Sequence, residues 1–151
     1  RLLAGVAKWG QIILLLCPIT SEHRPMLNAS AIDCIERVRL GFVASVTPNC
    51  RPLVPPKGTF VVLDGRMLAF GAICSPGTIS NIGHSQELEV NFVDNFTCKG
   101  WRIRGTTSVL RRGSAAFDAF YPQSQAFWVD LAGRINAIVA LYKDKFAQMY
   151  P

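Results

Sequence analysis

Small polar residues that follow the apolar run Phe70–Ile73 have the composition of an anion-binding loop. Ser75 and Thr78 offer hydroxyl groups, and Gly77 between them allows close approach of a ligand to the backbone. A helix predicted to start at this point would add free N–H groups and the positive end of its dipole. The pattern therefore predicts a phosphate site, with simple N-capping by Ser75 or Thr78 as the alternative.

A lysine in the segment Pro56–Thr59 is the second candidate for binding chemistry. Lys57 stands between a rigid proline and the permissive Gly58, where a predicted strand begins. A lysine held there could contact an anion or the polar edge of a ring. The alternative is a solvent-exposed turn lysine.

Residues for acid–base or metal chemistry are sparse. No Ser-His-Asp or Cys-His set is evident, and His84 is a lone histidine at the end of a predicted helix. The five cysteines are widely spaced without a CxxC pair, and there are two histidines, so no metal site is predicted. Either the protein binds without reacting, or a cofactor supplies the chemistry.

The hydrophobic pattern that must position these residues predicts a mainly β domain with peripheral helices. Helices are predicted over about 30–39, 77–84 and 123–133, and strands over 42–47, 51–54, 59–63, 66–73, 87–93, 100–110 and 135–142. Short antiparallel strands joined in hairpins with little helix are typical of a small barrel.

Local signals support several of these elements. Ser30 with Asp33 three residues later predicts a helix N-cap, and Asp64-Gly65 predicts a two-residue hairpin turn. Residues 87–93 alternate between polar and apolar. Their Glu87 and Glu89 are predicted to face Arg102 and Arg104 on the next strand in an ordinary cross-strand pairing.

Composition limits the class of protein. The chain has 151 residues, half of them hydrophobic, which suits one folded domain. The net charge is +6, but no basic run exceeds two residues, so nucleic acid is not a predicted partner. The apolar run Ile12–Leu16 is too short to span a membrane. The odd number of cysteines argues against a disulfide framework and favours reduced thiols and a cytoplasmic location.

The first 25 residues differ from the rest of the chain. They contain Lys8, the apolar run Ile12–Leu16 and then Pro18, which is a degenerate signal-like pattern. The pattern favours a natural start at Met26, with residues 1–25 as an N-terminal extension that is non-native or signal-like. Residues 26–151 are then predicted to be the functional domain.

A series of short motifs resembles the small flavoproteins of the pyridoxamine 5′-phosphate oxidase-like group. The motifs occur in the order seen in that group, at 56–64, 68–70, 75–81, 89–94 and 99–105. The resemblance covers about residues 27–142. It implies a six-stranded antiparallel split barrel that forms a homodimer and binds FMN at the dimer interface.

The resemblance also implies a set of cofactor-binding residues. Lys57, Gly58 and Thr59 would lie along the isoalloxazine ring and ribityl chain, and Ser75, Thr78 and Asn81 at the phosphate. Trp101 and Arg102 would approach the flavin from the partner subunit. No catalytic residue is assigned.

One departure from the family pattern concerns the phosphate loop. The vitamin oxidases carry an Arg-Lys pair there, whereas this loop reads Ser-Pro-Gly-Thr and has no cation. Lost charge-assisted bonds predict modest FMN affinity unless Lys57 or an arginine compensates. Residues for the pyridoxal substrate are not matched, so vitamin B6 oxidation is not assigned.

The function predicted from the sequence is therefore an FMN-dependent oxidoreductase that acts on an unknown small-molecule substrate or electron donor. Two alternatives remain open. One is a flavin-binding protein without catalysis on the same fold. The other is a β-barrel module that binds nucleic acid or another ligand. Related split barrels use other flavins, a deazaflavin or haem.

Overall fold

The structure is a computed structural model that describes residues 12–18, 27–63, 65–73 and 75–149. Its elements are β1 (Ile12–Pro18), α2 (Ala29–Val38), β2 (Gly41–Val46), β3 (Pro52–Leu53), β4 (Pro56–Lys57), β5 (Val61–Leu63), β6 (Met67–Gly71), α3 (Pro76–His84), β7 (Glu87–Asp94), β8 (Lys99–Arg111) and α4 (Ala115–Met149).

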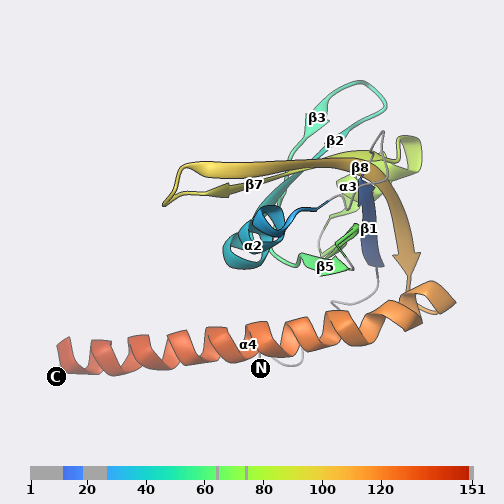
Figure 1. The fold of residues 1–151 in the computed structure, drawn as a ribbon. Helices are drawn as coiled ribbons and strands as arrows, with labels where there is room; N and C mark the ends of the chain where they lie inside the picture. Colours follow the sequence, from blue (N-terminus) through green and yellow to red (C-terminus); the bar gives the residue numbers. More distant parts are fainter. Residues whose placement is uncertain (1–11, 19–26, 64, 74, 150–151) are drawn as a thin grey trace. The chain divides into compact units, whose positions relative to one another are not determined.

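The strands form one antiparallel sheet with helices beside it, which confirms the predicted class of a mainly β fold. The strand order is β3-β2-β7-β8-β1-β6-β5, and β4 pairs with β2 off this path. Figure 1 shows β7 and β8 as a long hairpin, with β8 curving in its second half alongside β1. The described residues give an eight-stranded sheet whose order does not close on itself, so the six-stranded count and the barrel remain predictions.

The strand β1 lies inside the sheet. It pairs with β8, with Leu16 opposite Thr107, and with β6, with Leu16 opposite Leu68. Leu14 and Leu16 are completely buried. Leu14 and Leu16 thus belong to the hydrophobic core, and the division of the chain into an extension over 1–25 and a functional domain over 26–151 remains a prediction. The run Ile12–Leu16 is apolar at every position, so it lacks the alternation that marks a half-exposed strand.

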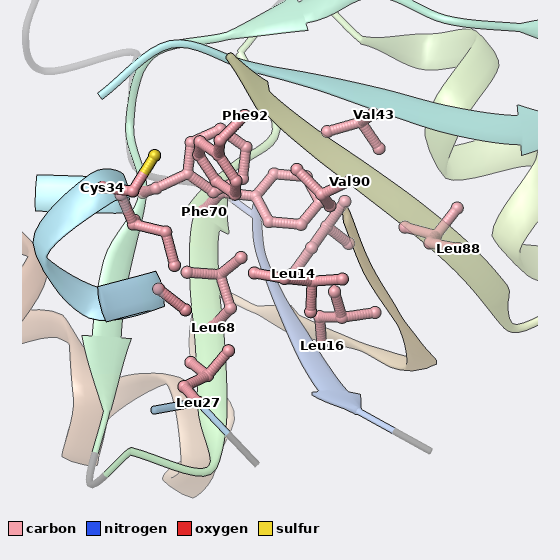
Figure 2. Packing of buried hydrophobic residues seen from close by; sticks show 14 of the residues in the cluster. Leu14, Leu16, Leu27, Cys34, Val43, Leu68, Phe70, Leu88, Val90 and Phe92 are labelled. Atoms are coloured by element: carbon pink, nitrogen blue, oxygen red, sulfur yellow. The ribbon is translucent and has the colours of Figure 1, made fainter. Parts of the chain in front are cut away.

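The hydrophobic core lies where β1, β6, β7 and β2 meet α2. Figure 2 shows Leu14, Leu68, Phe70 and Phe92 in this cluster, with Cys34 contributed by α2. The ring of Phe60 packs against Phe70 at a centroid distance of 5.2 Å and against Phe92 at 4.7 Å. These aromatic contacts join strands that are distant in the sequence.

The helix cap of α2 differs by two positions from the one predicted. The N-cap of α2 is Asn28 and not Ser30, because the side-chain oxygen of Asn28 accepts the N–H of Ala31 at 2.8 Å. Both residue types cap well, and the earlier one begins the helix. Cys50, in the turn between β2 and β3, has a φ of 58°, which lies in the left-handed region that favours glycine.

A buried carboxylate ties α2 to the turn between β7 and β8. Asp94 accepts hydrogen bonds from the guanidinium of Arg37, from the Phe96 N–H at 3.0 Å and from the Thr97 hydroxyl at 2.6 Å. These bonds hold the pKa of Asp94 well below its usual range. The hydrogen bond from Thr97 has the largest effect, and the one from Arg37 has the next largest.

The C-terminal part of the chain from Asp118 forms a separate compact unit. It consists of the helix α4, which continues through Pro122 and Gly133. The predicted helix over 123–133 is therefore part of a longer one, and the predicted strand over 135–142 is wrong. Short apolar runs do not distinguish strand from helix, and the alanine and leucine residues in this run favour helix. None of the helices in the described ranges combines the length and apolar character needed to cross a bilayer.

We expect Leu14→Ala to lower the free energy of unfolding by about 2–5 kcal/mol, because it opens a cavity in the core. The matched control is Leu40→Ala, at a side chain that is 47% exposed, which we expect to cost less than about 1 kcal/mol. Urea unfolding of both variants measures the difference. Equal, small losses would show that β1 does not belong to the core.

We expect Asp94→Asn to destabilise the fold most at neutral pH and progressively less as the pH falls below about 4. Because the folded-state pKa lies below the unfolded value of about 3.9, ionised Asp94 stabilises the fold above about pH 4. This contribution is lost as the pH falls through the folded-state value. Thermal unfolding of wild type and variant at pH 7, 5 and 3 tests this, with Glu36→Gln as an exposed control. A gap in stability that persists unchanged at pH 3 would contradict the account.

Candidate functional site

The helix α3 begins where the sequence analysis placed it, directly after the loop that contains Ser75. Ser75 is the N-cap residue and Pro76 occupies the first turn, where a missing N–H costs nothing. The Ser75 side chain makes no capping hydrogen bond to the helix. The N–H groups of Gly77 and Thr78 belong to the first turn and have no intrahelical acceptor. They and the helix dipole give this end a positive character.

A lysine from another part of the chain lies at this helix end. Lys57 is in β4, which pairs with β2 through Gly41. Its ammonium group donates a hydrogen bond to the hydroxyl oxygen of Ser75. The Ser75 hydroxyl in turn donates to the carbonyl of Ile73 at 2.8 Å. The loop that has no cation of its own therefore has one beside it, supplied from a residue 18 positions earlier.

The buried face of α3 carries two further residues of the predicted site. Thr78 is 1% exposed, and its hydroxyl has no hydrogen-bond partner among the described residues. Asn81 is also buried, and its side-chain amide donates to the hydroxyl of Ser45 in β2 at 2.9 Å. Asn81 therefore fastens the helix to the sheet. Ser45 was missed in the sequence analysis, although its place on the inner face of an alternating strand was the available signal.

Gly58 and Thr59 connect the lysine to the strands beneath it. The Thr59 hydroxyl oxygen accepts the N–H of Gly71, at the end of β6, at 2.8 Å. Gly58 is exposed, and a Cβ there would meet nothing closer than the Arg39 carbonyl at 4.0 Å. The Thr59–Gly71 bond keeps the β4 side of the site in register with the strand that leads to Ser75.

Trp101 and Arg102 lie on opposite faces of β8. Trp101 is half-buried against the hydrophobic core, whereas Arg102 is exposed and pairs with Glu89 at 3.3 Å. Arg104 pairs with Glu87 at 2.7 Å, so the predicted cross-strand ion pairs are confirmed. The approach of Trp101 and Arg102 to a flavin in a partner subunit remains a prediction, because it concerns a second chain.

Comparisons with known proteins give a likeness in fold. No known family and no curated protein matches the sequence. Among solved structures, the tagged HupZ of Group A Streptococcus at 1.70 Å resolution matches with a TM-score of 0.50 and 27% identity. A histidine-to-alanine variant of HupZ at 1.98 Å resolution gives the same score and identity.

The likeness to HupZ covers part of both proteins. It spans 54% of this chain, and 64% of the first HupZ chain and 68% of the second. This chain thus matches a little under two thirds of the length of the first. The comparison supports a related arrangement of strands over about half of this chain.

Proposed function

We propose that the protein binds FMN with the phosphate at the N-terminus of α3, as an FMN-dependent oxidoreductase on a split-barrel fold. This proposal rests on the hydrogen bond between the Lys57 ammonium and the Ser75 hydroxyl, which lies at a helix end without a side-chain cap. It brings a cation to the loop in which the resemblance places the phosphate.

The groups at this helix end fit a phosphate. Its oxygens would accept from the Gly77 and Thr78 N–H groups and from Lys57, and from the Ser75 hydroxyl if this turns away from the Ile73 carbonyl. The hydroxyl of Thr78 is buried without a partner among the described residues, which is the state of a group that an incoming acceptor would satisfy. Lys57 would supply the positive charge that the Arg-Lys pair supplies in the vitamin oxidases.

When bound, FMN would supply the hydride-accepting ring that the side chains of this site do not provide. The residues of this chain would bind and orient it. Gly58 and Thr59 lie next to Lys57 in sequence, where the ribityl chain and the ring would follow the phosphate. The homodimer with FMN at its interface rests on the family resemblance alone.

A module that binds nucleic acid is less well supported by the geometry. Its best candidate was the basic strand around Arg102 and Arg104. Both arginines are paired with glutamates of β7, so this face of the sheet offers balanced charges and no basic stripe. Flavin binding without catalysis remains the nearest alternative, and a reduction experiment distinguishes it.

We expect Lys57→Met to weaken FMN binding by about 1.5–3 kcal/mol, because a charged hydrogen bond to the phosphate is lost. Isothermal titration measures the affinity, and thermal unfolding checks that the variant folds. Lys99→Met removes the same charge from the exposed start of β8 and should leave the affinity unchanged. If both variants bind FMN like wild type, the phosphate does not lie at Lys57.

We expect NADH or NADPH to bleach the absorption band of the bound flavin under anaerobic conditions, because an oxidoreductase must let a donor reach the ring. Dithionite serves as the control that the bound flavin can be reduced at all. A flavin that dithionite bleaches but neither nucleotide does would favour binding without this reaction.

A further inference from the structure

A cavity lies at the C-terminal end of α3, away from Lys57 and Ser75. It is open to solvent, has a volume of about 630 Å³ and lies between the C-terminal half of α3 and the second half of β8. These two elements are neighbours in Figure 1. Its lining includes Ile79, Ile82, Gly83 and His84 from α3, and Thr107, Val109 and Arg111 from β8. The volume is that of a small-molecule site.

One lining residue is a buried polar group with an unmet hydrogen bond. Thr107 is 1% exposed, and its hydroxyl has no partner among the described residues. Its backbone N–H is already satisfied by the Gln86 carbonyl at 2.7 Å. A buried hydroxyl without a partner is costly and uncommon in folded proteins. Because Thr107 lines the cavity, a ligand that enters it could satisfy the hydroxyl.

The other lining residues place apolar side chains and a cation one after the other beyond Thr107. Side chains two residues apart in a strand share a face, so Thr107, Val109 and Arg111 follow one another along β8. Val109 is half-buried and Arg111 is exposed. Across from them, Ile79 and Ile82 of α3 add apolar surface. The lining therefore runs from a buried hydroxyl, over an apolar middle, to a cation.

The charges of the lining point to an anion. Arg111 carries a fixed positive charge, and His84 adds a basic group at the end of α3. None of the lining residues is an aspartate or glutamate. Arg111 stands four residues from Thr107, which corresponds to about 13 Å along an extended strand. That separation sets the length of a ligand that would use both groups.

We propose that this cavity binds a small amphipathic acid with a second polar group at its far end, such as a medium-chain hydroxy or oxo acid. The carboxylate pairs with Arg111, the chain packs on Val109, Ile79 and Ile82, and the far oxygen accepts from the Thr107 hydroxyl. This site is separate from the proposed FMN phosphate site and does not depend on it.

The test uses 10-hydroxydecanoate and decanoate as probes, with binding followed by backbone amide shifts of the full chain. We expect saturable shifts at Ile79, Gly83 and Thr107. Thr107→Val should weaken binding of 10-hydroxydecanoate about tenfold and leave decanoate within about twofold. Arg111→Gln should weaken both acids about tenfold, because both carry the carboxylate.

Matched controls lie next to each variant in the sequence. Thr106→Val changes an exposed threonine that does not line the cavity, and Arg112→Gln removes a neighbouring exposed charge. Both should bind the two acids like wild type. If Thr107→Val does not fold, the affinities of Arg111→Gln and Arg112→Gln for the two acids can still be compared. That comparison shows whether the carboxylate lies at Arg111.

Three results would overturn the proposal. The first is no saturable shift with either acid at millimolar concentration. The second is an equal effect of Thr107→Val on both acids, which would show that its hydroxyl does not contact the far oxygen. The third is a set of shifts centred on Ser75 and Gly77, which would assign the acids to the helix N-terminus instead.

Discussion

The pairing of β1 between β6 and β8 holds the two parts of the sheet together. Without it the strand path would divide into β3-β2-β7-β8 on one side and β6-β5 on the other. Its buried leucines, Leu14 and Leu16, add hydrophobic stabilisation to the backbone pairing on both sides. The core and the candidate site both depend on this strand.

The site depends on it because its two halves come from the two parts of the sheet. Lys57 is on β4, which pairs with β2, whereas Ser75 follows β6. The Lys57–Ser75 bond and the Thr59–Gly71 bond join them. A phosphate at the α3 N-terminus would therefore be held by groups whose positions are set by the pairing of β1 with β6 and β8 and by the Asn81–Ser45 bond beneath the helix.

The sequence predicted those elements whose pattern is local. The alternation of residues 87–93 and the long strand after them led to the correct ion pairs of Glu87 and Glu89. The start of α3 was also predicted, from Ser75 and the residues after it. Strand β1 was not recognised, because the run Ile12–Leu16 is apolar at every position and shows no alternation.

The contacts of the candidate site were harder to predict than its residues. The residue types of Lys57 and Ser75 suggested anion binding, but their contact spans 18 positions and exists only once β4 and β6 are placed. The hydrogen bond from Asn81 to Ser45 could not be predicted for the same reason, because the sequence does not show which acceptor a buried amide will meet. The continuous helix α4 replaced a predicted helix and strand, because a run of apolar residues with alanine fits either state.

In the proposed site, the N-terminus of α3 and Lys57 recognise the phosphate of a flavin. A comparison of FMN with riboflavin tests it most directly, because the two differ only in that phosphate. Isothermal titration of the full chain with each compound should show FMN binding more tightly by about tenfold or more, as expected when charge-assisted bonds are added. Equal affinity for both, or no binding of FMN, would contradict the account.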